Sequence, residues 1–366
     1  MDASVRDLLE VAAEQEQIRE ELGVLLFEPA PEDFDPLEAT ADELLAHGYP
    51  AQPDPERRGE LFDHWKQRMS RPMSIIEPQF SVMPEGVQTA ADLASLSANW
   101  SGGVVVVRDG DAVMRVNGSW TVPHVFQPQQ PGIYECATWI GIDGGRPILS
   151  DEQVRVARRP ELGDVEAPPP LGNIPPIDPD GGVEAPPPLG NFPPNPVSTN
   201  ILQAGTTQRI VATWPSLGVT QSTWVWWEWT PANPVAISNF PVSPGDVMFC
   251  EIHALSATEA KFFLMNQTSG VTTSFVKPVP SNGTPLVGDC AEWILEVRKN
   301  VGDTPELADY GTVYFDNCDA LSREFADLNP GTAELVMMTN DEGDLISIPE
   351  VPANELMRVI RDFPIQ

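Results

Sequence analysis

Apolar residues recur at helical spacing in the first part of the chain. This period predicts a helix over residues 4–27. Thr40 and Glu43 form a capping box, which predicts a short second helix directly after Thr40. A third helix is predicted over residues 55–69, where a proline suits the first turn. We therefore expect residues 1–96 to form a helical N-terminal extension. It either packs on the main domain or covers a cleft as a pro-segment that is later removed.

From Ser97 the pattern changes to short segments that alternate or are rich in β-branched residues, which is typical of strands. Asp109-Gly110-Asp111 is a tight hairpin signal between the first two. Strands at this spacing predict an all-β fold over residues 97–366, an antiparallel two-sheet sandwich of the jelly-roll or concanavalin-like kind. The candidate strands are 104–107, 112–122, 136–143, 200–213, 223–229, 247–256, 260–266, 271–276, 291–298 and 311–316.

One proline-rich segment departs from the strand pattern. The sequence of residues 163–176 recurs almost unchanged at 181–194, so the stretch at about 151–198 contains a tandem duplication. Such a composition predicts an extended, polyproline-like insertion. It is either a tolerated surface loop or a flap that faces the substrate or docks a partner.

Charge narrows the range of partners. Asp and Glu number 54 against 21 Lys and Arg, which gives a formal net charge of −33. A polyanion repels nucleic acid and anionic lipid, so we exclude both as partners. The self-repulsion at neutral pH is relieved in acid, which fits an acid-adapted protein. No segment reaches the ~18–20 apolar residues of a membrane helix, and no signal peptide is visible at Met1. The compartment stays open, and we expect a monomer.

The four cysteines suggest no metal site. Cys136, Cys250, Cys290 and Cys318 are widely spaced, with no CxxC pair and no histidine cluster beside them. A structural zinc site is therefore not expected. Three disulfide pairings are possible, and the sequence does not choose among them.

A glutamate and a glutamine interrupt two apolar strands. In the strand 291–298, alternate residues form one fully apolar face, whereas Glu292 and Glu296 share the other. Gln203 similarly shares a face with Ile201 and Gly205. Each could be a simple exposed strand residue. A carboxylate that faces a carboxamide can instead activate a water and polarise an amide, so the pair suggests a peptide-bond hydrolase.

Tryptophans give a second candidate feature. In the run 224–229, Trp226 and Glu228 share one face with Trp224, and Trp227 and Trp229 share the other. Such rings offer stacking surface for a peptide or a sugar, or they are simply buried on both faces. Farther upstream, Trp139 and Asp143 share a face, and Asp143 is either a site residue or part of the turn that follows.

Several short motifs occur in order between about residues 97 and 320. They are Asn99-Trp-Ser-Gly102, Val116-Asn-Gly-Ser-Trp-Thr-Val-Pro123, Trp139-Ile-Gly-Ile-Asp-Gly144, Ile201-Leu-Gln203-Ala-Gly205, Trp227-Glu-Trp229 with Pro231, Ser243-Pro-Gly-Asp246, Ala291-Glu292-Trp293-Ile294 and Ala308-Asp-Tyr-Gly311. Each motif is weak alone, but the ordered set resembles the eqolisin family of glutamic peptidases. The long connection before Gln203 and the acidic helical N-terminus depart from the family pattern.

The resemblance implies a β-sandwich with its active site on a concave sheet face, no cofactor or metal, and an extracellular location. It places the catalytic residues at Gln203 and Glu292. It also implies a substrate-binding set at Trp100, Trp139, Asp143, Trp226, Trp227, Glu228 and Trp229.

We therefore expect an acid endopeptidase that cleaves protein or peptide substrates, with an acidic pH optimum. The N-terminal extension is a candidate intramolecular inhibitor of this enzyme. Two alternatives stay open. One is a jelly-roll glycoside hydrolase with a carboxylate pair such as Glu228 and Glu292. The other is a non-catalytic sandwich that binds carbohydrate or peptide.

Overall fold

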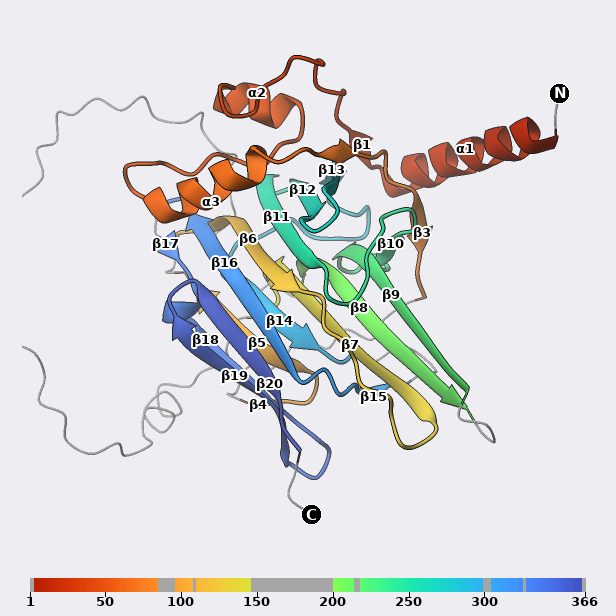
Figure 1. Ribbon diagram of the computed structural model, residues 1–366. Coiled ribbons are helices and arrows are strands. Elements are labelled where there is room, and N and C mark those ends of the chain that lie inside the picture. The colour runs from red at the N-terminus through yellow and green to blue at the C-terminus, as the bar shows by residue number, and fades with distance from the viewer. Residues whose placement is uncertain are drawn as a thin grey trace, which may run out of the picture.

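The computed structural model describes residues 3–84, 96–107, 110–145, 200–213, 218–298, 304–324 and 327–363. Within these ranges the chain forms two antiparallel β-sheets that pack face to face, with three helices near the N-terminus (Figure 1). The fold class predicted from the sequence is therefore confirmed. The duplicated proline-rich insertion lies outside the described residues.

Sheet 1 carries the strands that contain Gln203 and Glu292. Its strands pair in the spatial order β3, β10, β9, β8, β7, β14, β5 and β18. Their bounds are β3 (Phe80–Val82), β10 (Val235–Ile237), β9 (Gly218–Trp229), β8 (Leu202–Thr213), β7 (Gly132–Ile142), β14 (Cys290–Glu296), β5 (Trp100–Val106) and β18 (Glu334–Thr339). The short β15 (Glu306–Leu307) runs parallel to the start of β7.

Sheet 2 forms the other layer of the sandwich. Its central strands pair in the order β13, β12, β11, β6, β16, β20 and β19, and β18 closes the far end because it pairs with strands of both sheets. The main strands are β13 (Val271–Pro278), β12 (Glu259–Asn266), β11 (Val247–Ser256), β6 (Val113–Thr121), β16 (Thr312–Ser322), β20 (Leu356–Arg361) and β19 (Leu345–Ala353). Short additions are β1 (Leu25–Leu26), β2 (Ser74–Ile75), β4 (Leu96–Ser97), β17 (Asp327–Leu328) and the 3-10 turn η1 (Pro330–Thr332).

The predicted hairpin around Gly110 is wrong. β5 pairs with β14 and β18 in sheet 1, whereas β6 pairs with β11 and β16 in sheet 2. The connection between them therefore crosses from one sheet to the other. A turn signal marks a change of direction in the chain, but burial against other strands decides which strand becomes the partner. Sequence analysis also named no strand after residue 316, where β18, β19 and β20 complete the sandwich.

The core lies between the inner faces of the two sheets. Alternation along each strand sends one set of side chains inward, including Trp293 and Leu295 from β14 and Phe262 and Leu264 from β12. These side chains are fully buried. Burying a large apolar side chain contributes about 1.5–3 kcal/mol, so this layer fixes which face of each strand points outward.

The N-terminal region holds α1 (Ala3–Leu22), α2 (Ala41–Ala46) and α3 (Gly59–Met69). The capping box before α2 is present as predicted. The first helix stops before residue 27, because Gly23 adopts a left-handed φ of 66° and the chain then enters β1. The third begins at Gly59 instead of 55, because the Asp54 carboxylate caps a turn at Glu56. No helix in the described ranges is long and apolar enough to cross a membrane.

Residues 27–73 cover the outer face of sheet 2. An apolar cluster joins Leu44, Trp65 and Met69 of this region to Phe249 and Phe263, which point away from the inter-sheet core. The opposite end of the region enters sheet 1, because β3 pairs with β10 and Phe80 lies inside the core. The division of the chain at residues 96 and 97 stays a prediction, but the described part of the extension is built into both sheets.

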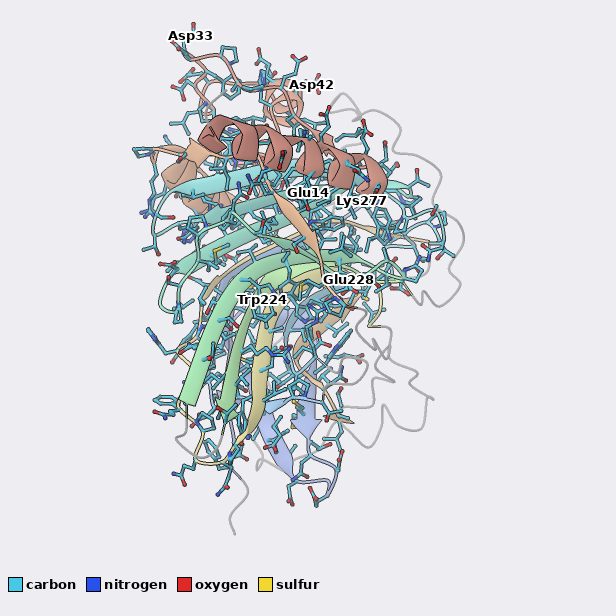
Figure 2. The ribbon with its side chains drawn as sticks, turned by 90° about the vertical axis from the view of Figure 1, so that its right-hand side faces the viewer. Glu14, Asp33, Asp42, Trp224, Glu228 and Lys277 are labelled. Carbon is cyan, nitrogen blue, oxygen red and sulfur yellow. The ribbon has the colours of Figure 1, made fainter. Side chains whose placement is uncertain are left out.

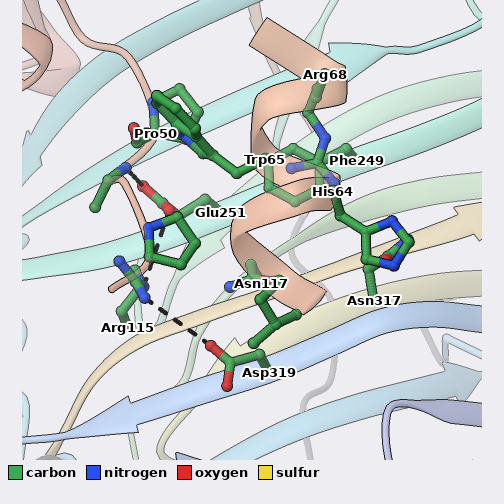
Figure 3. A pocket seen from close by; sticks show the side chains of 13 residues that line it. Pro50, His64, Trp65, Arg68, Arg115, Asn117, Phe249, Glu251, Asn317 and Asp319 are labelled. Carbon is green, nitrogen blue, oxygen red and sulfur yellow. Dashed lines mark hydrogen bonds and ion pairs between the residues drawn. The ribbon is translucent and has the colours of Figure 1, made fainter. Parts of the chain in front are cut away.

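Charged side chains also hold residues 51–69, which include α3, to sheet 2. Figure 3 shows Arg68 of α3 together with Phe249, Glu251 and Asp319 of sheet 2. Arg58, just before the helix, lies 2.7 Å from the Asp319 carboxylate. The Arg68 guanidinium stacks 3.5 Å above the Phe249 ring. The Glu251 carboxylate, on the strand below, accepts from the Ala51 amide at 3.2 Å. The Arg58–Asp319 ion pair is buried, and Arg68 is buried against Phe249, so α3 is an integral part of the fold.

Candidate active site

Four residues form one row across sheet 1. Glu292 of β14 lies opposite Gly141 of β7, Gly141 opposite Gln203 of β8, and Gln203 opposite Glu228 of β9. Residues directly opposite in a sheet project from the same face. The three side chains therefore emerge together on the outer face of sheet 1, which we call the site face. Figure 2 shows Glu228 and Trp224 on β9.

The glycine in this row makes room for the glutamate. Strands lie about 4.8 Å apart, so the backbones of Glu292 and Gln203 are about 10 Å apart across β7. A Cβ atom on Gly141 would come within 2.8 Å of Glu292 Oε2. Glu292 therefore leans over Gly141 in the direction of Gln203. A side chain at residue 141 would fill the space into which the glutamate reaches.

The hydrogen bonds leave reactive groups of the pair unused. Gln203 Nε2 donates to Glu228 Oε2 at 2.8 Å, and Cys290 Sγ donates to Glu292 Oε1 at 3.3 Å. Gln203 Oε1 and Glu292 Oε2 are buried without a hydrogen-bond partner among the described residues. A buried polar atom without a partner is costly, and it calls for an explanation such as a bound water or a catalytic role. Both side chains have zero exposed surface.

Tryptophan rings pack against one another on the site face, next to the row that contains Glu292 and Gln203. Trp139 and Trp100 meet edge to face, with ring centroids 5.1 Å apart. The Trp139 indole donates to Glu296 Oε2 at 2.9 Å, and Asn99 Nδ2 donates to Glu296 Oε1 at 3.3 Å. Trp226 belongs to the same apolar cluster. Glu296 therefore fixes the orientation of rings that lie one row away from the Glu292 and Gln203 pair.

The Arg298 side chain reaches into this acidic face beside Glu228. Arg298, just beyond β14, lies on the same face as Glu292 and Glu296 by strand alternation. Its Nη2 lies 3.4 Å from Glu228 Oε2, and its guanidinium stacks 4.3 Å from the Trp226 ring. Arg298 and Glu228 are 4 % and 2 % exposed. This buried ion pair is therefore shielded from salt and solvent.

Burial dominates the electrostatics of the site. It raises the pKa of Glu292 well above its ordinary value, and Asp289, Asp143 and Glu296 raise it further, against the thiol hydrogen bond. Burial also raises the pKa of Glu228 to about 7, although Arg298 pulls it down. The site face thus favours neutral carboxylic acids over carboxylates.

The other predicted site residues divide into two groups. Trp100, Trp139, Trp226 and Glu228 lie on the site face, as described above. Trp227 and Trp229 project from the opposite face of β9 into the core between the sheets. Trp227, for example, packs 5.5 Å from the Phe275 ring. Strand alternation accounts for this placement, and the structure does not bring these two rings to Gln203.

Asp143 follows β7 with a left-handed φ of 67° and is fully buried. Its carboxylate accepts from the backbone amides of Val287 and Asp289, at 2.8 and 2.9 Å. Burial raises its pKa to about 7, and the nearby Asp289 adds to the effect. Asp143 thus anchors the turn that leads into β14, the strand that carries Glu292.

Glu296, Arg298 and Cys290 also lie on the site face, although they were not among the predicted site residues. The alternation of β14 puts all three on the face of Glu292, and this signal was available in the sequence. It could not show that Glu296 would reach Trp139 or that Arg298 would reach Glu228, because those partners come from β7 and β9. Among the described residues, no group of three or more His, Cys, Asp or Glu side chains is placed to hold a metal ion.

A cavity of about 700 Å³ lies on the other side of the sandwich and is lined by residues of α3 and of the outer face of sheet 2, including His64 and Tyr314. It contains neither Gln203 nor Glu292. We place the candidate site by the chemistry of the Glu292 row, which brings a carboxyl and a carboxamide to one face.

Comparisons with known proteins bear on the whole domain. The model of the Peptidase A4 family matches residues 98–155 and 194–357, which is more than half of the chain. Aspergillopepsin-2 of Aspergillus niger is 31% identical over 99 residues, which cover 26% of this chain and 34% of that protein. The alignment therefore spans about a third of the length of this curated relative.

Solved structures are also similar. A scytalido-glutamic peptidase with a transition state analog inhibitor has a TM-score of 0.47 and 19% identity, and the match covers 72% of this chain and 98% of that one. The aspergilloglutamic peptidase from Aspergillus niger has a TM-score of 0.42 and 20% identity, over 63% of this chain and 99% of that one. The extent of the family match confirms what the ordered motifs predicted, and the chain belongs to the Peptidase A4, or eqolisin, family of peptidases.

Proposed function

We propose that this protein is an acid endopeptidase in which Glu292 and Gln203 form the catalytic pair. The observation that carries the proposal is the single row across sheet 1. It sets a carboxyl and a carboxamide on one face, separated by a glycine, each with an oxygen that has no partner among the described residues. Family membership supports the same reaction class.

The mechanism uses one water and no covalent intermediate. Ionised Glu292 accepts a proton from the water while the water oxygen attacks the scissile carbonyl carbon. The carbonyl electrons move to its oxygen, and a Gln203 N–H donates to this oxyanion. The tetrahedral intermediate then collapses, the carbon–nitrogen bond breaks, and Glu292 returns its proton to the leaving amine. Because a glutamine side chain does not titrate, the oxyanion donor stays available in acid.

The first step needs the carboxylate form of Glu292, whereas burial raises its pKa. While the site face is shielded from water, Glu292 is therefore mainly protonated at acidic pH. Contact with water removes the main cause of the shift and lowers the pKa. Ionisation of Glu292 consequently accompanies exposure of the site face to water and substrate, and the acid limb of the pH profile of kcat/KM reports this ionisation.

The rings on the site face are the proposed substrate contacts. Trp100, Trp139 and Trp226 give an apolar, stacking surface next to the pair. Glu228 holds Gln203 by a hydrogen bond. Asp143 holds the turn before β14, the strand that carries Glu292. A peptide that lies across the strands would place its scissile bond over Gly141, with its flanking side chains against the rings.

The described N-terminal region supports a structural role better than an inhibitory one. Its helices α2 and α3 pack on the outer face of sheet 2, and the catalytic pair lies on the outer face of sheet 1, across the sandwich. We therefore propose that residues up to β3 stay bound to the mature enzyme. N-terminal sequencing of the acid-treated protein tests this, because a cut that released residues before Phe80 would contradict it.

The test of function is digestion of a denatured protein at pH 3–5 by the wild type and by Gln203→Ala and Glu292→Gln. Loss of the oxyanion donor is expected to lower kcat by about 10²–10³, and loss of the carboxyl to abolish turnover. The exposed strand residues Gln221 and Glu259 supply matched controls, Gln221→Ala and Glu259→Gln, which should keep full activity. Retention of activity in both site variants would refute the proposal.

A further inference from the structure

We propose that Arg298 is a positioning residue of the catalytic pair: it holds Glu228, and Glu228 keeps the Gln203 carboxamide in the orientation that catalysis needs. The inference rests on the proposed function and deepens it. Its basis is a chain of three contacts on the site face, in which Trp226 supports Arg298, Arg298 contacts Glu228 and Glu228 contacts Gln203.

The Gln203 carboxamide and the Arg298 guanidinium contact the same oxygen of Glu228. Gln203 Nε2 lies 2.8 Å and Arg298 Nη2 lies 3.4 Å from Glu228 Oε2. A guanidinium only donates, and it stays charged at any pH relevant to a protein. Oε2 must therefore act as an acceptor in both ionisation states of Glu228. When Glu228 takes up a proton, the positive guanidinium favours Oε1 as its position, because an unprotonated Oε2 is the stronger acceptor.

The orientation of Gln203 follows from this constraint. An unprotonated Oε2 can only accept, so it is met by the amide nitrogen of Gln203 and not by its carbonyl oxygen. One N–H is thus committed to Glu228, while the second N–H and Oε1 remain for the reaction. Oε1 has no partner among the described residues. It can accept from the attacking water while the second N–H donates to the oxyanion.

The orientation of the Gln203 carboxamide depends on Arg298 most strongly in acid. Since burial raises the pKa of Glu228 to about 7, the group is neutral when the enzyme works in acid. A neutral carboxyl without Arg298 could put its proton on Oε2 and donate to the Gln203 carbonyl. The carboxamide would then be flipped, and its oxygen would be lost to the reaction. Besides Gln203 and Arg298, Glu296 also influences Glu228, and its negative form would favour this protonation further.

Several features of Arg298 fit positioning better than substrate binding. The side chain is almost completely buried, and its guanidinium carbon lies over the Trp226 ring, 4.3 Å from the centroid. Stacking fixes the plane of the donor fork, which a lysine ammonium on a flexible stem cannot reproduce. The arginine reaches Gln203 only through Glu228, so its removal should affect the chemical step and leave substrate binding nearly unchanged.

The experiment is a double-mutant cycle with Arg298→Met, Glu228→Ala and the double variant, assayed at pH 4 on a quenched peptide substrate. Arg298→Met is expected to lower kcat by about tenfold, the preference set by one hydrogen bond, with KM changed less than about threefold. Arg298→Lys should recover part of the loss. The double variant should be no slower than Glu228→Ala, because without Glu228 the arginine has nothing to hold.

Controls separate this inference from the proposed function. Arg358→Met removes an arginine from an exposed pair with Glu350 and should leave kcat unchanged. If Gln203→Ala and Glu292→Gln keep activity, the function itself fails. If they lose activity while Arg298→Met matches the wild type, only the role of Arg298 fails. The role of Arg298 also fails if the losses of kcat in Arg298→Met and Glu228→Ala multiply in the double variant. It fails as well if Arg298→Met changes KM alone. Should Arg298→Met not fold, full activity of Arg298→Lys would contradict the argument.

Discussion

The stability of the protein should depend on pH through Glu228, and a single amide substitution should remove that dependence. Burial raises the pKa of this carboxyl from 4.5 to about 7, so the folded state binds the proton more tightly than the unfolded chain. The associated stability is fully present below pH 4.5 and is lost as the pH rises through 7. Gln at this position is neutral at every pH and should show no such loss.

The magnitude follows from the two pKa values. Each tenfold difference in proton affinity between the folded and unfolded states corresponds to about 1.4 kcal/mol. For Glu228 the difference is therefore worth about 3 kcal/mol. Between pH 4 and pH 8, the wild-type side chain should lose about 3 kcal/mol more of the free energy of unfolding than Glu228→Gln does.

The assay is urea unfolding followed by tryptophan fluorescence at pH 4, 5, 6, 7 and 8. All variants carry Glu292→Gln, which blocks self-digestion without adding a charge. Glu259→Gln, on an exposed strand end, is the control and should follow the pH dependence of the parent. If Glu228→Gln and the parent lose stability in parallel, within about 0.5 kcal/mol, the carboxyl titrates as it does in water and the reasoning is refuted.

Three further predictions concern the glycine of the row, the packing of β3 and the state of the cysteines. Gly141→Ala should lower kcat/KM by about 10², because its methyl group would displace Glu292 Oε2. Gly59→Ala, whose methyl group meets open space, should leave kcat/KM unchanged. Wild-type activity of Gly141→Ala would contradict the geometry of the row. Phe80→Ala should lower the free energy of unfolding in urea by about 3–5 kcal/mol, since the ring packs 5.3 Å from Phe275 in the core; a loss below about 1 kcal/mol would make β3 peripheral. Reductant should leave Tm unchanged, because all four cysteines are buried free thiols, and a clear drop in Tm would reveal a disulfide.

Local signals in the sequence predicted much of the fold. The capping box at Thr40 marked the start of α2, because a threonine oxygen and a glutamate three residues later satisfy the exposed amides of a helix end. Alternation in residues 291–298 separated the apolar side chains, which enter the core, from Glu292 and Glu296. The third helix was placed too early, because a proline suited to a first turn does not outweigh a side-chain cap at Asp54.

The tryptophan run shows where local signals end. Alternation correctly divided its side chains between two faces, but it could not tell which face belonged to the core. The family resemblance assigned Trp226, Trp227 and Trp229 together to the site. Only the packing of β9 against sheet 2 put Trp227 and Trp229 in the core and left Trp226 beside Arg298.

The strand periodicity, the reactive residue types and, through the ordered motifs, the family could be predicted from local patterns. These depend on residues close together in the chain, where spacing alone sets which side chains share a face. The shared row of Glu292, Gln203 and Glu228, the placement of β5 and β6 in different sheets, and the position of α3 across the sandwich from the candidate site came from the folded chain. Strand neighbours far apart in the chain are chosen by the burial of whole faces, which is a property of all the strands together.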